Sequence, residues 1–214
     1  MVVQKVMKGV LMKALVLTQY SHFEIQDVPC PDPGDHEVLV AVRACGICGS
    51  DVHGMDGSTG RRVPPIIMGH EASGVIVKKG KAVDRWEEGA RVTFDSTLYC
   101  GTCHFCRRGS INLCENRRVL GVSCDEYRRD GAFAEYVALP EHIVYSLPNE
   151  VTFEEAALVE PLSVALHAVI RSGVCLGDCV LVVGTGVIGL LIVQVLKTVG
   201  ARKIFAVDVD SNRL

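Results

Sequence analysis

Residues 178–208 read DCVLVVGTGVIGLLIVQVLKTVGARKIFAVD, and they predict a strand, a helix and a second strand. The apolar run from Asp178 to Val183 is typical of a parallel strand that is buried on both faces. After a glycine-rich turn, the pattern predicts a helix from about Val187 to Val199 and a strand from Lys203 to Val207. This order predicts one βαβ unit of an α/β sheet.

The turn itself, Gly184-Thr185-Gly186-Val187-Ile188-Gly189, has the spacing G-x-G-x-x-G. The first glycine permits a tight turn, the second lets the backbone approach a pyrophosphate, and the third allows close contact between helix and strand. Unpaired N–H groups at the helix N-terminus then bind the phosphates. Asp208 follows about 20 residues later at a strand end, which is the context that a dinucleotide site requires. The alternative is a turn whose glycines serve packing only.

Asp208 decides the expected cofactor. Its carboxylate can accept hydrogen bonds from the adenosine ribose hydroxyls and would repel a 2′-phosphate, so the sequence favours NAD over NADP. Arg213 is close enough along the chain to contact the same ribose, although an exposed, solvated arginine is an equal alternative. We therefore predict NAD as the cofactor, bound by Gly184, Gly186, Val187, Ile188, Gly189, Asp208 and Arg213.

Upstream of this unit, the chain has the pattern of short strands separated by turn residues. Apolar and β-branched residues concentrate at 13–18, 37–42, 74–77 and 91–94, and proline-rich and glycine-rich stretches lie between them. This pattern predicts a compact unit of the all-β or α+β class.

The pattern changes to a helical one after Pro148. Thr152 fits the N-cap of a helix that contains Glu154 and Glu155 in its first turn, and a second helical run follows Pro161. We therefore predict a mainly-β domain at 12–160 and the beginning of a nucleotide-binding domain at 161–214.

Composition excludes several classes of protein. A net charge of −3 argues against a nucleic-acid partner, which usually requires a basic excess. The longest apolar stretch, Val187 to Val193, is far below the roughly 18 residues of a membrane span, and no signal peptide is visible. Ten cysteines without an export signal indicate metal binding in a reducing cytoplasm rather than disulfides.

Four of these cysteines form a tight cluster with the spacing C-x2-C-x2-C-x7-C, within a lobe at 96–118. Four thiolates at that spacing can close a tetrahedron around zinc and leave no position for a substrate, so the predicted site is structural. The alternatives are four unrelated cysteines or a zinc module that binds nucleic acid. Paired arginines favour the second alternative, but acidic residues offset most of their charge. The predicted ligands are Cys100, Cys103, Cys106 and Cys114.

A second set of possible ligands is scattered along the chain, in GICGSDVH at 46–53, GHE at 69–71 and VEP at 159–161. One thiolate, one imidazole and one carboxylate leave the fourth zinc position open, as a catalytic zinc requires. Each residue also has a simpler explanation. His70 could be a hydrogen-bonded core histidine, Glu160 could cap a helix, and Cys48 could form a redox pair with Cys45.

In combination and in order, these motifs resemble the medium-chain zinc alcohol dehydrogenase family, from Met12 onward. The resemblance implies a GroES-like catalytic domain followed by a Rossmann domain. It also implies Cys48, His70 and Glu160 as ligands of a catalytic zinc, in addition to the structural zinc. Glutamate in the context Glu160-Pro161-Leu162-Ser163 resembles the sorbitol and polyol branch, whereas the primary-alcohol branch has a cysteine at this position.

The resemblance further implies roles for the neighbouring residues. Ser50 matches the hydroxyl that contacts the substrate alcohol, and His53 matches a proton-relay position. Glu71 is expected to approach the metal and to exchange with a ligand during turnover. Asp51 is expected to orient His70. In the implied reaction, zinc lowers the pKa of a secondary alcohol of the polyol class and hydride passes to NAD, which leaves a ketone.

A doubly wound nucleotide domain needs about six strands, whereas this chain supplies two. We therefore expect a chain truncated within the Rossmann domain, inert by itself, and a full-length form that is a homo-oligomer. The alternatives to an oxidoreductase are a non-catalytic zinc-binding fragment and a zinc-dependent lyase or dehydratase on the same scaffold. NADH formation with a polyol would separate them.

Overall fold

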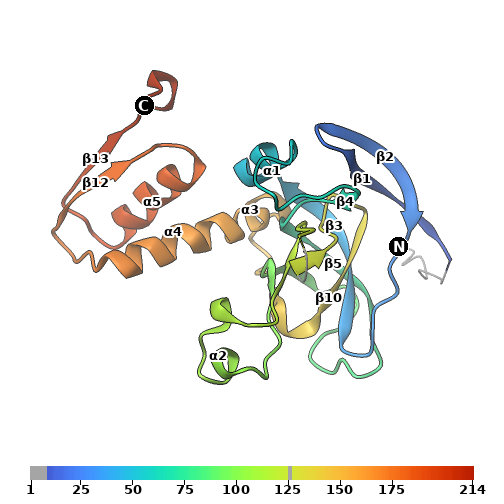
Figure 1. The fold of residues 1–214 in the computed structure, drawn as a ribbon. Coiled ribbons are helices and arrows are strands. Elements are labelled where there is room, and N and C mark those ends of the chain that lie inside the picture. Colours follow the sequence, from blue (N-terminus) through green and yellow to red (C-terminus); the bar gives the residue numbers. More distant parts are fainter. Residues whose placement is uncertain (1–8, 125–126) are drawn as a thin grey trace. The chain divides into compact units, whose positions relative to one another are not determined.

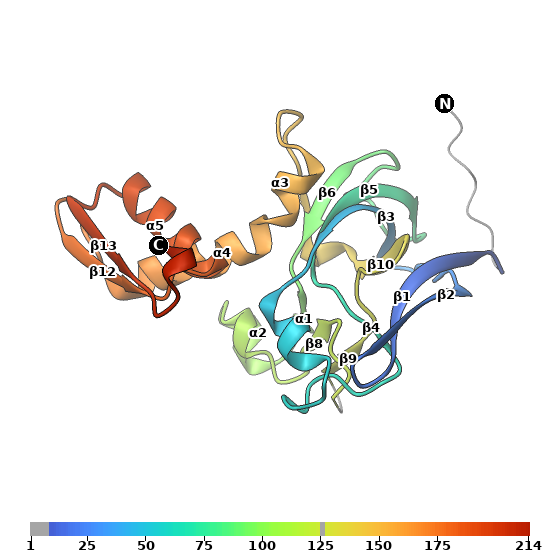
Figure 2. The same ribbon diagram turned by 90° about the horizontal axis from the view of Figure 1, so that it is seen from above.

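The computed structural model describes residues 9–124 and 127–214. The chain divides into two compact units, Met1–Ala157 and Leu158–Leu214. Strands predominate in the first unit, and two longer helices accompany a pair of strands in the second (Figures 1 and 2). Among the described residues, no helix has the length and apolar character needed to cross a bilayer.

The first unit is built around an antiparallel sheet with the strand order β10-β3-β5-β6-β11. Alternate side chains of these strands, such as Val38, Val40, Ile76 and Val92, point into one fully buried apolar core. The strands are β3 (Glu37–Gly46), β5 (Glu71–Lys79), β6 (Arg91–Phe94), β10 (Tyr136–Pro140) and β11 (Val144–Ser146).

Two smaller sheets complete the strands of this unit, with the orders β2-β1-β4 and β7-β8-β9. Their strands are β1 (Leu11–Gln19), β2 (His22–Pro29), β4 (Ile66–Ile67), β7 (Thr97–Leu98), β8 (Arg118–Leu120) and β9 (Arg128–Arg129). The first unit also contains short helices: α1 (Gly49–Gly54), α2 (His104–Arg107), α3 (Phe153–Ala157), and the 3-10 turns η1 (Ile111–Leu113) and η3 (Glu141–Ile143).

The strands predicted from β-branched content are confirmed, because 13–18, 37–42, 74–77 and 91–94 lie within β1, β3, β5 and β6. Strand β2 was not among the predicted strands. It pairs with β1 over most of its length, and its side chains are largely exposed or half-buried. A strand that buries so little apolar surface has a weak alternation of apolar and polar residues.

The helix predicted after Thr152 is confirmed, and its cap has the expected geometry. The backbone N–H of Glu155 donates to Thr152 Oγ1 at 3.2 Å, and the N–H of Thr152 donates to a carboxylate oxygen of Glu155 at 2.8 Å. This is a capping box. Helix α3 is then tied to the main sheet by the Ser73 hydroxyl, which donates to the carbonyl of Phe153 at 2.6 Å.

The second unit contains the predicted βαβ arrangement. Strands β12 (Cys179–Val183) and β13 (Lys203–Val207) are parallel and joined by helix α5 (Val187–Thr198), and the turn η4 (Ser211–Arg213) follows. Helix α4 (Val159–Ser172) precedes them and begins two residues before Pro161 rather than after it. Proline is tolerated there because the first turn of a helix has N–H groups without helical partners.

The prediction that the first parallel strand is buried on both faces is wrong for the described residues. Val182 points into a core with Ala165, Val195 and Leu196, but Leu181 and Val183 on the opposite face are 59% and 78% exposed. The side chains of a strand alternate between two faces, and helices α4 and α5 contribute to the core on one face only.

Candidate functional site

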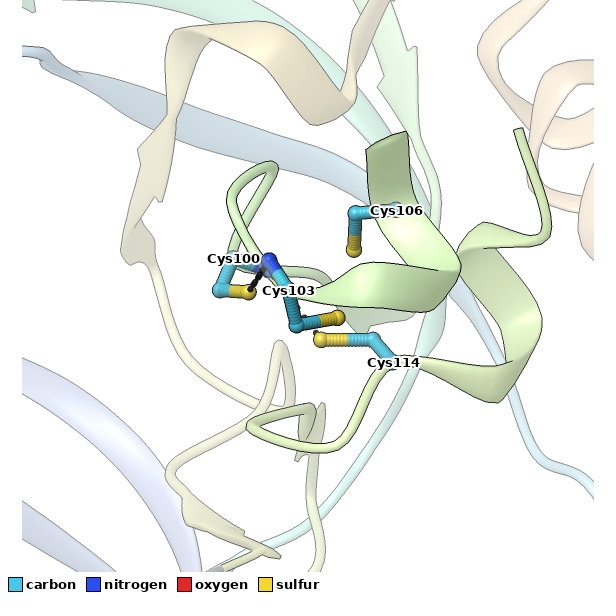
Figure 3. Close-up of side chains that lie close together, drawn as sticks. All are labelled: Cys100, Cys103, Cys106 and Cys114. Carbon is cyan, nitrogen blue, oxygen red and sulfur yellow. Dashed lines mark hydrogen bonds between the residues drawn. The ribbon is translucent and has the colours of Figure 1, made fainter. Parts of the chain in front are cut away.

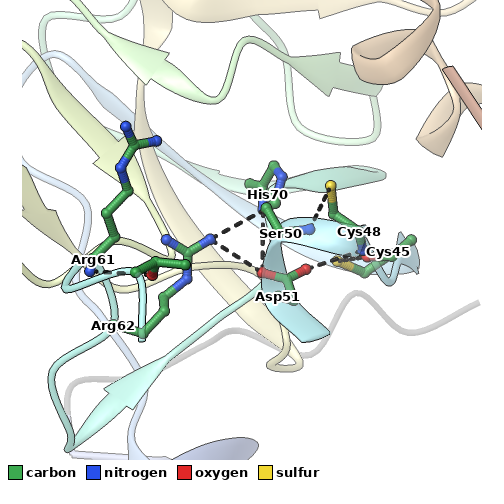
Figure 4. Close-up of polar contacts among 9 residues, drawn as sticks. Cys45, Cys48, Ser50, Asp51, Arg61, Arg62 and His70 are labelled. Carbon is green, nitrogen blue, oxygen red and sulfur yellow. Dashed lines mark hydrogen bonds and ion pairs between the residues drawn. The ribbon is translucent and has the colours of Figure 1, made fainter. Parts of the chain in front are cut away.

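Helix α1 begins at an unusual cap, in which the side chain of Cys48 takes the capping role. Cys48 Sγ accepts a hydrogen bond from the N–H of Ser50 at 3.5 Å, and Asp51 Oδ2 accepts one from the N–H of Cys48 at 3.1 Å (Figure 4). This reciprocal pair closes the first turn. One helical turn therefore fixes the Cys48 sulfur, the Ser50 backbone and the Asp51 carboxylate relative to one another.

Glu71 is the first residue of β5 and His70 immediately precedes it, opposite the end of β3, where Gly46 pairs with Glu71. A Cβ atom at Gly46 would lie 2.6 Å from Glu71 Oε2, so glycine leaves room for this carboxylate. The ligand atoms of Cys48, His70 and Glu71 all lie within 4.8 Å of one another. Thiolate, imidazole and carboxylate are all zinc ligands, and three of them leave the fourth tetrahedral position open.

Asp51 is buried behind this group. Its Oδ1 atom lies 3.6 Å from His70 Nδ1 and 3.3 Å from Nη2 of Arg62. Burial opposes ionisation, but the nearby His70 ring, the N–H of Cys48 and the charge of Arg62 together hold the pKa of the Asp51 carboxyl below its ordinary value. Asp51 and His70 thus lie next to each other, as the sequence predicted. Arg62 also belongs to this site, and sequence reasoning did not identify it.

The two cysteines of the C-x-x-C pair have different surroundings. Cys48 Sγ lies with His70 and Glu71, whereas Cys45 is not part of that group. Burial raises the pKa of the Cys45 thiol to about 12. Burial also raises the pKa of the Cys48 thiol, and hydrogen bonds from Ser50 oppose this effect. A raised pKa disfavours the thiolate form that a redox pair requires.

The remaining predicted catalytic residues are placed as follows. Ser50 is exposed, and its Oγ accepts a hydrogen bond from Arg62 Nη2 at 3.5 Å. His53 is exposed near the end of α1. Glu160 lies in the first turn of α4, in the second unit, so its role as a third ligand stays a prediction. The carboxylate that the first unit itself places beside Cys48 and His70 is that of Glu71.

The four clustered cysteines converge in the lobe that contains α2 and η1 (Figure 3). Their sulfur atoms all lie within 4.8 Å of one another. A zinc ion with Zn–S bonds of about 2.3 Å needs sulfur atoms about 3.8 Å apart, so the cluster fits a tetrahedral ion after small adjustments. The cysteines are Cys100, Cys103, Cys106 and Cys114.

Hydrogen bonds to sulfur prepare this cluster for a cation. Cys100 Sγ accepts from the Thr102 hydroxyl at 3.6 Å and from the N–H of Cys103 at 3.4 Å, and Cys114 Sγ accepts from the N–H of Cys100 at 3.3 Å. Donors from Thr102, Cys103 and Asn116 lower the pKa of the Cys100 thiol to about 5. Burial and the neighbouring Cys103 sulfur instead raise the pKa of the Cys106 thiol to about 12, so Cys100 is the thiolate of the pair at neutral pH. Zinc binds the thiolate form.

The glycine-rich turn between β12 and α5 has the predicted local geometry. Gly184 has a φ of +92°, which L side chains rarely adopt. A Cβ atom at Gly189 would lie 1.9 Å from the carbonyl oxygen of Gly184, so only glycine fits between helix and strand. At Gly186 the nearest atom to such a Cβ is Nη1 of Arg213 at 3.9 Å, which leaves the backbone open on that side.

Asp208 follows β13 directly and reaches the same turn. Its Oδ2 accepts the N–H of Thr185 at 2.7 Å, and its Oδ1 accepts the N–H of Asp210 at 2.9 Å. These N–H donors hold the pKa of the Asp208 carboxyl below its ordinary value. Asp208 thus also fixes the turn through its contact with Thr185. The sequence motif alone does not indicate this contact.

Comparison with known proteins shows a consistent set of relatives. The alcohol dehydrogenase GroES-like domain family matches residues 34–149. D-xylulose reductase A of Aspergillus oryzae is 42% identical over 205 residues, which cover 94% of this chain and 56% of the reductase. Sorbitol dehydrogenase of Halalkalibacterium halodurans is 41% identical over 196 residues, which cover 90% of this chain and 55% of that protein.

Among solved structures, a candidate zinc-binding dehydrogenase of Sinorhizobium meliloti 1021 bound to NADP has a TM-score of 0.87 at 38% identity. The match covers 96% of this chain and 58% of that one. The chain thus spans little more than half the length of the proteins it matches. A GroES-like unit followed by a βαβ unit is the predicted fold class, and the matches confirm it. The chain belongs to the family of alcohol dehydrogenases with a GroES-like domain.

Proposed function

We propose that the protein that contains this chain is a zinc-dependent oxidoreductase, which converts a secondary alcohol of the polyol or sugar-alcohol class to a ketone and reduces NAD. The observation that carries the proposal is the convergence of Cys48, His70 and Glu71, with the Ser50 side chain within hydrogen-bond reach of Cys48. The names of the relatives, D-xylulose reductase A and sorbitol dehydrogenase, support the polyol class of substrate.

The donor set fits a catalytic zinc, because a thiolate and an imidazole with one carboxylate leave a coordination position for a substrate oxygen. Cys48 and His70 would hold the ion, and Glu71 or Glu160 would supply the carboxylate. Glu71 is supported by its place in the group, and Glu160 by the resemblance to polyol dehydrogenases. When bound, the zinc supplies the positive charge that lowers the pKa of an alcohol, and NAD accepts hydride from its carbon.

The chain's own residues orient the alcohol and remove its proton. Ser50 is exposed, and its side chain is within hydrogen-bond reach of Cys48, so its Oγ can accept the hydroxyl proton of a substrate while it releases its own proton. His53 is exposed on the same short helix and can pass that proton to solvent. Asp51 orients His70 from the buried side through the contact to Nδ1, which leaves Nε2 for the metal. Cys100, Cys103, Cys106 and Cys114 would hold a second, structural zinc.

The preference for NAD over NADP rests on Asp208, whose negative charge opposes a 2′-phosphate. The solved relative from Sinorhizobium meliloti is bound to NADP, so this preference needs a direct measurement. Assembly as a homo-oligomer and a cytoplasmic location also stay predictions.

The test is NADH formation by the purified protein with a panel of polyols, sugar phosphates, threonine and butanediol, run in parallel with NADP. We expect NADH with at least one polyol, loss of activity after chelation, and recovery when zinc is added. A product formed by loss of water without NADH would favour a lyase. No NADH from any secondary alcohol, with both zinc sites loaded, would contradict the proposal.

A further inference from the structure

Arg62 is a buried arginine behind the ligand group, and nothing in the sequence motifs gives it a role. It lies in the loop between α1 and β4, and its side chain is only 5% exposed. Taking a guanidinium out of water is unfavourable unless charged and polar partners compensate it. Its partners therefore indicate what the residue does.

Both partners of Arg62 Nη2 belong to α1. It donates to Asp51 Oδ1 at 3.3 Å and to Ser50 Oγ at 3.5 Å (Figure 4). The same Asp51 oxygen lies 3.6 Å from His70 Nδ1, while the other oxygen of Asp51 accepts the N–H of Cys48. One arginine is thus connected, through one carboxylate, to both Cys48 and His70.

The position of Arg62 is fixed from several sides. A Cβ atom at Gly54 would lie 2.8 Å from Arg62 Cγ, so the glycine at the end of α1 makes room for the aliphatic stem. On either side of Arg62 along the chain, the carbonyl of Arg61 accepts the N–H of Ser123, and the N–H of Val63 donates to the Ser123 hydroxyl. The guanidinium therefore reaches α1 from a restrained loop.

Arg62 also contributes to the charge balance of the ligand group. When zinc is bound, the thiolate of Cys48 and the carboxylates of Asp51 and Glu71 carry one more negative charge than the ion carries positive. The guanidinium of Arg62 offsets that excess close to Asp51. Arginine has N–H donors and no acceptor, so Ser50 Oγ must accept from it, and the proton of the Ser50 hydroxyl points elsewhere.

We propose that Arg62 is a positioning residue of this site, which holds Asp51 against His70 and Cys48 and orients the Ser50 hydroxyl toward the substrate. The inference rests on the proposed function, because it assumes that Cys48 and His70 bind a metal. Residues that orient ligands from behind typically change metal affinity by about 10–100-fold when they are replaced.

The test compares Arg62→Met, which keeps the apolar stem, with Arg62→Lys, which keeps the charge. Arg61→Met is the matched control, because Arg61 is the adjacent arginine and is exposed. Each purified variant is loaded with cobalt or zinc, and we measure the cobalt absorption spectrum, the rate of metal release to a chelator, and kcat and KM for the alcohol. Circular dichroism verifies the fold.

For Arg62→Met we expect an altered cobalt spectrum and metal release from the Cys48 site about 10–100-fold faster than in the wild type. The metal at the four cysteines should be unaffected, and kcat should fall more than KM rises. Arg62→Lys should restore part of the loss, and Arg61→Met should behave as the wild type. If Arg62→Met does not fold, Arg62→Lys decides the question, with an expected release rate several-fold above that of the wild type.

A folded Arg62→Met variant with wild-type spectrum, release rate and kcat would overturn the role of Arg62 alone. Where Arg62→Met does not fold, wild-type behaviour of Arg62→Lys would overturn it as well. A wild-type protein that binds metal only at the four cysteines would instead overturn the proposed catalytic centre, and this inference with it.

Discussion

At the scale of single residues, Cys48 has two tasks, because its sulfur belongs to the ligand group and also caps α1. Replacing it with serine separates these tasks, since a serine hydroxyl is a good helix cap. We expect Cys48→Ser to fold normally but to lose the zinc that a mild chelator removes, together with redox activity. Elemental analysis before and after chelation measures this loss.

The matched control for that variant is Cys45→Ser, because Cys45 is three residues away and is not part of the ligand group. It should keep both metals. The closed four-cysteine site should resist the same chelator in both variants, because all four of its positions are filled by thiolates. If Cys45→Ser loses metal and Cys48→Ser keeps it, the assignment of the ligand is reversed.

Asp208 also has two roles to separate, since its carboxylate fixes the turn at Thr185 and is proposed to select NAD. Asp208→Asn keeps a side-chain oxygen for the N–H of Thr185 and removes the negative charge. We expect weaker use of NAD and a smaller difference between NAD and NADP, measured as the ratio of the two kcat/KM values. Asp178→Asn, which changes a carboxylate of the same unit that accepts the N–H of Cys175, should leave the ratio unchanged. Equal efficiency of the unmodified enzyme with both cofactors would count against this role.

The residues that sequence patterns could predict are those in contiguous motifs. Cys48 and His70 stand in such motifs, and the structure brings their ligand atoms together with that of Glu71. Arg62 could not be found in this way. Beside Arg61 it reads as one of two solvated arginines, and its burial depends on Gly54 and on Ser123, which is distant in sequence. Only the folded chain shows that Gly54 and Ser123 lie close to the segment that contains Arg62.

At the scale of elements, the glycines of the nucleotide turn differ in what they do. Gly189→Ala would place a Cβ atom 1.9 Å from the carbonyl oxygen of Gly184, a clash that separates α5 from β12. Overpacking of this kind costs typically about 1–3 kcal/mol, and we expect a lower unfolding temperature for the second unit. Calorimetry or thermal circular dichroism measures the change.

Gly186→Ala is the comparison variant, because a Cβ atom there meets nothing closer than Arg213 Nη1 at 3.9 Å. It should fold as the wild type does, yet bind NAD more weakly, since the methyl group occupies the side from which a pyrophosphate approaches. Titration calorimetry with NAD measures this effect. Equal NAD affinity of Gly186→Ala and the wild type would show that the backbone at Gly186 does not approach the cofactor.

Element types were predictable wherever the local signal was strong. The alternation of β-branched residues located β1, β3, β5 and β6, and the Thr152–Glu155 pair located the start of α3. The burial of β12 was not predictable from its apolar run, because such a run does not show whether other elements cover one face of the strand or both. Among the described residues, only the face that carries Val182 is buried. Strand β2 is mostly exposed and left too weak a pattern.

At the scale of the whole molecule, each unit has its own apolar core, one under the main sheet and one between the helices and the βαβ strands. The proposed metal ligands Cys48, His70 and Glu71 belong to the first unit, and the proposed nucleotide residues belong to the second. The family match covers residues 34–149 within the first unit. The proposed reaction therefore depends on residues from both units.

Hydride transfer from an alcohol carbon to NAD is the central claim, and isotope transfer tests it most directly. Sorbitol or xylitol that carries deuterium on its secondary carbinol carbons is incubated with NAD and the zinc-loaded protein, and the NADH is analysed by mass spectrometry. We expect one deuterium in the NADH, a ketone as the second product, and no transfer in Cys48→Ser. NADH without deuterium, or a dehydrated product without any NADH, would contradict the account.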